Sequence, residues 1–139
     1  IVERGVPDYK HGRTQLELGS FFEACREQHR LFAAVETRVR VGPGRVLVPD
    51  VVVFHPEPPP ERVPSAPPLL VVEVLSDDDR MSAVREKLAE YRAWGVRHVW
   101  LVDPQLQRLY VCDDGGLREV VSLALPELGL EITAGIVFD

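Results

Sequence analysis

The sequence contains little that would indicate a disulfide-linked, membrane-bound or exported protein. Its two cysteines, Cys25 and Cys112, lack the close spacing of a metal-binding pair. No apolar run approaches the roughly 18 to 20 residues that cross a bilayer, and no basic segment followed by an apolar one opens the chain. We therefore expect no membrane association, a cytoplasmic location, and buried free thiols in a reducing compartment rather than a disulfide.

Basic residues are outnumbered by acidic ones, 16 against 22. The net charge of -6 excludes binding to nucleic acid through a uniformly basic surface, although it leaves room for a local basic face. Lysine is rarer still, because only Lys10 and Lys87 among the 16 basic residues are lysines. A chain that otherwise uses arginine has kept an ammonium group at two positions, which makes Lys87 informative.

Hydrophobic periodicity predicts alternating helices and strands in one compact domain, residues 1–139. Because the chain opens with Ile1 inside strand-like sequence, we expect that further residues precede it. The expected elements are a helix over 11–29, strands over 32–41 and 45–54, a proline-rich loop over 55–68, a strand over 69–75, a helix over 76–94 that begins with cap residues Ser76 to Asp79, a strand over 98–103, and a hairpin over 109–121. This order predicts an α/β sandwich with a mixed central sheet flanked by helices.

Two acids stand in apolar segments, Asp50 within VLVPDVVVF and Glu73 within LLVVEVL. A buried carboxylate without a partner costs several kcal/mol or becomes neutral, so each acid needs a partner. If the two strands are neighbours, the carboxylates face each other at about 5 Å and ionise together only beside a cation. Mg²⁺ prefers such hard oxygen ligands and Mn²⁺ can replace it, so the pair predicts a metal site.

Lys87 lies on the helix that follows the Glu73 strand, one turn before Tyr91. Its ammonium group can reach the two carboxylates. There it could orient or deprotonate an attacking water and offset the charge on a pentacovalent phosphate. Arginine would serve poorly as a base because it does not release its proton.

Several segments together resemble a known family over nearly the whole chain. These are VPD at 48–50, VVEVLS at 71–76, the K-x-x-x-Y of Lys87 and Tyr91, and GVRHVWLVDP at 95–104. They are similar to the Uma-two family of restriction endonucleases, a branch of the PD-(D/E)XK nuclease superfamily with a restriction-endonuclease-like fold. The histidine of KHGR at 10–13 fits the same pattern.

The resemblance implies that Asp50 and Glu73 are the metal-binding acids and that His11 is an accessory residue near the site. The superfamily places its lysine two residues after the glutamate, where this chain has Leu75. The resemblance therefore implies that Lys87 supplies the amine from the following helix.

Structural roles remain open for each of these residues. Asp50 is also a common turn residue beside proline, and Glu73 could pair with Arg38 or Arg40 on a neighbouring strand. The side chain of Lys87 could extend from a helix flank into solvent, and His11 could have no function. The Asp77–Asp79 run is most simply a helix cap, although one of its acids could contact a metal through water.

Three functions are consistent with this sequence. The first is a Mg²⁺-dependent (or Mn²⁺-dependent) endonuclease that hydrolyses phosphodiester bonds, in DNA, as a homodimer. The second is a catalytically inactive nuclease-like scaffold that binds nucleic acid or protein. The third is a small-molecule metallohydrolase that uses the same carboxylates.

Overall fold

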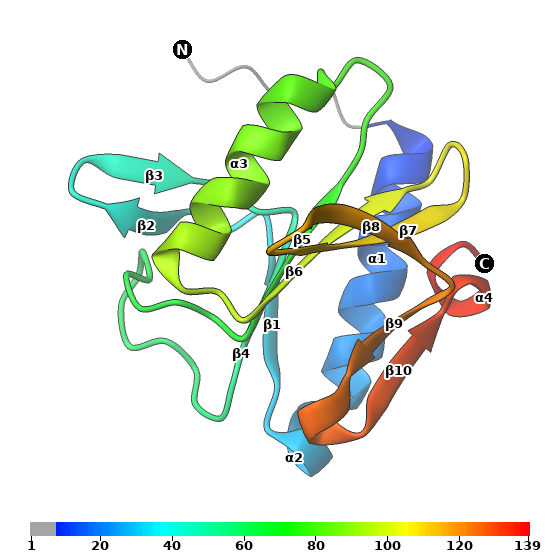
Figure 1. Ribbon diagram of the computed structural model, residues 1–139. Helices are drawn as coiled ribbons and strands as arrows, with labels where there is room; N and C mark the ends of the chain where they lie inside the picture. Colours follow the sequence, from blue (N-terminus) through cyan, green and yellow to red (C-terminus); the bar gives the residue numbers. More distant parts are fainter. Residues whose placement is uncertain (1–7) are drawn as a thin grey trace.

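The computed structural model describes residues 8–139 and contains a six-stranded sheet with helices on both faces (Figure 1). The strand order is β1–β4–β5–β6–β7–β8, in which β5 and β6 run parallel and all other neighbours run antiparallel. The strands are β1 (Phe32–Val35), β4 (Val51–Phe54), β5 (Leu70–Val74), β6 (His98–Asp103), β7 (Arg108–Asp113) and β8 (Gly116–Val120). The predicted α/β sandwich with a mixed sheet is confirmed. The strand-like opening of the chain lies outside the described residues.

The two long helices, α1 (Tyr9–Ala24) and α3 (Met81–Trp94), cover opposite faces of this sheet (Figure 1). Leu70, Val72 and Val74 of β5 pack in the core that contains α1, whereas Val71 packs in the core that contains α3. Because both faces of β5 are covered, its sequence is almost continuously apolar. The one polar residue of β5, Glu73, is therefore surrounded by packed elements.

The remaining elements are small. A hairpin of β2 (Val39–Gly42) and β3 (Arg45–Leu47) projects beside α3, and a second two-stranded sheet lies on the α1 side (Figure 1). This second sheet and its neighbours are β9 (Ser122–Leu125), η1 (Pro126–Leu128), β10 (Leu130–Thr133) and α4 (Ala134–Val137). None of the helices in the described part of the chain is long and apolar enough to span a membrane. Both cysteines are free, but they are partly exposed rather than buried as predicted.

Each of the two strands predicted over 32–41 and 45–54 is broken into two. The first breaks at Glu36, whose φ of 50° is in the left-handed region that strands do not use. The second breaks around Pro49, which has no N–H to donate to a ladder. As a result β1 and β4 join the main sheet, whereas β2 and β3 form the separate hairpin.

Both predicted helices also differ at one end. The first ends at Ala24 and is followed by the short α2 (Arg26–His29). The second begins at Met81 instead of directly after Ser76, because the Asp79 carboxylate accepts a hydrogen bond from the Ser76 N–H at 2.8 Å and does not cap the helix. Ser76 to Asp79 are therefore loop residues rather than helix caps.

Gly95 ends α3 at a φ of 113°, and a Cβ there would lie 3.3 Å from Cγ of Pro67. Gly95→Ala should therefore lower the free energy of unfolding by about 1 to 2 kcal/mol. Gly19→Ala in α1 is the matched control, since a Cβ there would meet only Cγ1 of Val35 at an ordinary contact distance of 3.8 Å. The control should raise stability by about 0.5 to 1 kcal/mol. Equilibrium urea denaturation measures both, and equal effects of the two substitutions would contradict this account.

Candidate active site at the end of β4 and β5

Asp50 occupies the gap between β3 and β4 that Pro49 creates. The antiparallel register pairs Val51 with Val72, so its continuation places Asp50 opposite Glu73 and Pro49 opposite Val74. The N–H of Leu75 bonds to Val102 of β6, and the N–H of Val74 consequently points the other way, toward β4.

The Asp50 carboxylate takes the place of the missing ladder partner. Its Oδ2 accepts the Val74 N–H at 2.7 Å. His11 Nε2 lies 3.3 Å from the other oxygen, Oδ1, and both side chains are buried. The Asp50 backbone carbonyl accepts a hydrogen bond from Gln15 at 2.8 Å, so residues of α1 fix this end of β4.

His11 is held in turn by the start of its helix. It lies in the first turn of α1, where its backbone N–H donates to Oδ1 of the N-cap residue Asp8 at 2.9 Å. The imidazole is only 2% exposed and faces the sheet with Thr14 and Leu18. The cap therefore fixes the position of His11 along the sheet, and with it the contact between the imidazole and Asp50.

Glu73 points to the α3 face of the sheet, as its alternation with Val72 and Val74 requires. Tyr91 donates its hydroxyl to Oε2 at 2.8 Å, and Lys87 Nζ lies 3.2 Å from Oε1. Lys87 also donates to the carbonyl of Val48 at 3.1 Å. Both partners of Glu73 lie on one face of α3, and neither Arg38 nor Arg40 pairs with it among the described residues.

The two carboxylates differ in charge state. Burial raises the pKa of Asp50, but the hydrogen bonds from His11 and Val74 outweigh it and leave that pKa below its ordinary value. Burial and the charge of Asp50 raise the pKa of Glu73 to about 8, although Lys87 and Tyr91 favour the ionised form. Burial, followed by the Glu73 charge, raises the pKa of Tyr91, which therefore stays a hydrogen-bond donor.

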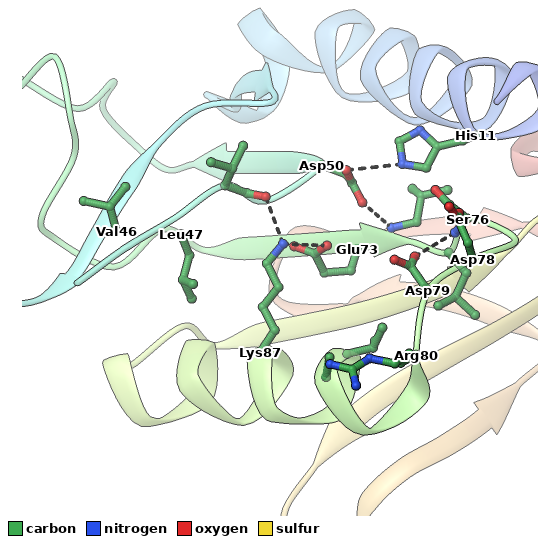
Figure 2. A pocket seen from close by; sticks show the side chains of 15 residues that line it. His11, Val46, Leu47, Asp50, Glu73, Ser76, Asp78, Asp79, Arg80 and Lys87 are labelled. Carbon is green, nitrogen blue, oxygen red and sulfur yellow. Dashed lines mark hydrogen bonds and ion pairs between the residues drawn. The ribbon is translucent and has the colours of Figure 1, made fainter. Parts of the chain in front are cut away.

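All four predicted site residues line one cleft of about 310 Å³ (Figure 2). His11 approaches from α1, Asp50 from the residue before β4, Glu73 from β5 and Lys87 from α3 (Figure 2). The structure thus brings these residues together, and their catalytic and metal-binding roles stay predictions. Within residues 8–139, no group of three or more His, Cys, Asp or Glu side chains forms a metal site by itself.

Some residues at this cleft were missed as site residues. Tyr91 was named only as part of the K-x-x-x-Y motif, because its spacing on α3 cannot indicate what its hydroxyl contacts. Arg80 lines the cleft with Asp78 and Asp79, which follow β5 in the loop before α3. The position of this loop directly after the Glu73 strand is the sequence signal that could have indicated Arg80.

The raised pKa of Glu73 predicts how the stability of the metal-free protein depends on pH. Because this pKa is about 8 in the folded state against an ordinary value of 4.5, the folded state binds the proton more tightly. The resulting stabilisation is complete below pH 4.5 and is lost as the pH rises to 8, by up to about 1.4 kcal/mol per pH unit. Urea denaturation in a chelator between about pH 5 and 8 avoids the acid range in which Asp50 titrates.

Glu73→Gln should flatten this slope, because the amide does not titrate. Glu86→Gln is the matched control, since Glu86 lies exposed on the same helix as Lys87. The control should keep the parent slope. A Glu73→Gln variant as pH-dependent as the parent would show that another group causes the effect.

Comparisons with known proteins show the family and the fold of this chain. The Uma2 (Uma-two) family model, described as "Putative restriction endonuclease", matches residues 1–135. A solved structure from Anabaena variabilis, described as a "putative nuclease", has a TM-score of 0.86 and 22% sequence identity. The match covers 99% of this chain and 84% of that one, and at this identity it shows a shared fold. No curated protein matches. Because the family model spans nearly the whole chain, the protein belongs to the Uma2 family.

Proposed function

We propose that the protein is an endonuclease that hydrolyses phosphodiester bonds in DNA, in the cytoplasm, with a divalent cation bound by Asp50 and Glu73. The observation that carries the proposal is the convergence of two carboxylates and the Lys87 ammonium group in one cleft. Membership of a family described as restriction endonucleases supports the same reaction class.

The donor set fits a hard cation such as Mg²⁺ or Mn²⁺. Asp50 and Glu73 each keep lone pairs beyond the ones their hydrogen bonds use, because an ionised carboxylate accepts at about four positions. The charge of Asp50 raises the pKa of Glu73, so a cation between them would relieve a repulsion that the protein itself does not remove. Mg²⁺ commonly binds through one or two carboxylates and completes its shell with water and substrate phosphate.

When bound, the cation would supply positive charge to the phosphate oxygens and lower the pKa of a water molecule. Residues of the chain would orient the attacking water and stabilise the developing charge. Lys87, fixed between Glu73 and the Val48 carbonyl, would orient the attacking water and stabilise the negative charge that develops on the phosphorane. Water would attack phosphorus as the P–O bond to the leaving sugar oxygen breaks. The attacking water would release one proton to solvent and the leaving oxygen would take one proton from solvent, so each bond broken consumes one water molecule.

His11 and Tyr91 act as positioning residues in this proposal. Each donates to one of the carboxylates, His11 to Asp50 and Tyr91 to Glu73, and each is buried. Hydrogen bonds of this outer kind orient ligands and tune their basicity. Asp50 is thus held by a residue of α1, and Glu73 is held by a residue of α3.

A second candidate is a scaffold that binds nucleic acid without cutting it. Leu75 stands where the superfamily has its lysine, and the amine comes from α3 instead. The acidic net charge also favours this candidate over a nuclease that binds DNA through a broadly basic surface. Cleavage distinguishes it from the endonuclease.

Plasmid nicking in a titration of Mg²⁺ and Mn²⁺ tests the proposal. The parent should nick supercoiled DNA only with the metal, and Lys87→Ala should lower the rate by about 10² to 10³-fold because one charge-stabilising donor is lost. Asp50→Asn and Glu73→Gln should abolish metal binding, measured by calorimetry, whereas Lys87→Ala should retain it.

Arg85→Gln is the control, because Arg85 lies on the same helix as Lys87 and outside the residues that line the cleft. Its nicking rate should equal that of the parent. A parent that binds DNA and metal but never nicks would establish the scaffold, and a Lys87→Ala variant with parental activity would remove Lys87 from the mechanism.

The proposal includes a homodimer, since cutting both strands of a duplex is most direct with two paired sites. Exposed Leu106 and Val121, from segments toward the C-terminal end, provide apolar surface for pairing. Sedimentation equilibrium should give twice the monomer mass, and Val121→Glu should shift the protein toward monomer. A monomeric parent at the concentrations that cleave both strands would contradict the dimer.

A further inference from the structure

Most arginines of this acidic protein are neutralised by a carboxylate of the same chain. The pairs are Arg13–Glu17, Arg26–Glu23, Arg30–Glu57, Arg45–Glu90, Arg92–Asp114, Arg97–Glu127, Arg108–Glu119 and Arg118–Asp113. In the described part of the chain, only Arg38, Arg40, Arg62 and Arg85 have guanidinium groups without a hydrogen bond or ion pair. All four are exposed.

Three of these four arginines gather around one short strand. Arg40 lies in β2, and Arg38 directly precedes this strand. Val39 between them is buried and both arginines are exposed, so both arginines project away from the core. The N–H of Arg40 donates to the carbonyl of Pro64 at 2.8 Å, so the segment that holds Arg62 runs along the free edge of β2. Trp94 of α3 anchors that segment through a hydrogen bond to the Ser65 carbonyl.

This arginine cluster, Arg38, Arg40 and Arg62, lies next to the candidate active site. Arg40 pairs across the hairpin with Val46, and directly opposed residues of an antiparallel pair project on the same face. Val46, Leu47 and Val48 line the cleft that contains Lys87 (Figure 2). The Val48 carbonyl, directly after β3, accepts the Lys87 hydrogen bond, so the hairpin that carries Arg40 leads straight to the residue that contacts the Lys87 amine.

The carboxylates nearest in sequence do not neutralise the cluster. Glu61 accepts hydrogen bonds from the Ser65 hydroxyl and N–H, and Glu36 accepts one from Gln15. Three exposed positive charges are thus left unpaired at one place in a chain with a net charge of -6. Such a surface complements a polyanion, and its neighbour is a cleft suited to phosphodiester chemistry.

We propose that Arg38, Arg40 and Arg62 bind the phosphate backbone of duplex DNA beside the scissile phosphate. This inference rests on the proposed function, because it takes the bound DNA to be the substrate of the candidate active site. The contacts would fix the register of the duplex on the hairpin without reading its sequence. They would also explain how an acidic protein holds a polyanion close to two acids.

Fluorescence anisotropy with a labelled duplex, in a chelator that prevents cleavage, tests this proposal. Replacing all three arginines by glutamine should weaken binding by about tenfold or more near 0.1 M salt. The slope of log K against log salt should become shallower by about 2 to 3, since each lost phosphate contact removes about 0.9. Replacing all three by lysine should keep the parental slope, because the charge remains.

The matched control replaces Arg85, Arg97 and Arg108 by glutamine, which removes the same charge from three exposed arginines elsewhere. Its affinity should stay within about threefold of the parent, because distant exposed charges are screened at this salt. Equal weakening by the two glutamine variants would overturn the inference, as would a parent that does not bind DNA. Competition by polyglutamate as effective as competition by DNA at equal charge would also overturn it.

Nicking assays on the same proteins separate this inference from the proposed function. A parent that binds through the cluster but never nicks DNA supports the inference and contradicts hydrolysis. If the parent nicks DNA and the glutamine variant of the cluster binds DNA as tightly as the parent, hydrolysis is supported and the inference is overturned. Thermal melting checks that all variants are folded, and the lysine variant tests the cluster with its side-chain bulk and charge preserved.

Discussion

The structure around the cleft depends on one constraint, that Glu73 is buried beside a second carboxylate. In the middle of an apolar sheet, an acid side chain is stable only where polar groups reach it. α3 supplies these groups, a hydroxyl from Tyr91 and an ammonium from Lys87, one turn apart on one face. The docking of α3 on the sheet and the electrostatics of the cleft therefore have the same origin.

Pro49 has a comparable effect on the other acid. By ending the ladder between β4 and β5, it leaves the Val74 N–H to be bonded by a side chain, and Asp50 is the side chain in reach. Together with the break at Glu36, this break lets β2 and β3 leave the main sheet as a hairpin, which becomes a wall of the cleft. One proline thus fixes the orientation of an acid and creates the surface beside it.

The sequence predicted the parts that depend on local pattern. The apolar run around Glu73, the strand over 98–103 and the helix that carries Lys87 and Tyr91 all correspond to observed elements. The breaks at Glu36 and before Met81 could not be predicted, because a left-handed backbone and an aspartate bonded to the loop arise from tertiary contacts. For the site, the residue identities followed from polar interruptions and the family resemblance, but their hydrogen-bond partners required the fold.

The unpaired arginines illustrate this limit most clearly. In sequence Arg38 and Arg40 alternate with valines as ordinary strand residues, and nothing separates them from Arg45, which pairs with Glu90 through two hydrogen bonds. Only the packing of α3 against the hairpin decides which guanidinium meets a carboxylate. Net charge describes the average of the surface, whereas recognition of a polyanion depends on where pairing is incomplete. An acidic total is therefore compatible with a local polyanion site, provided that the remaining arginines neutralise acids elsewhere, as most of them do in this fold.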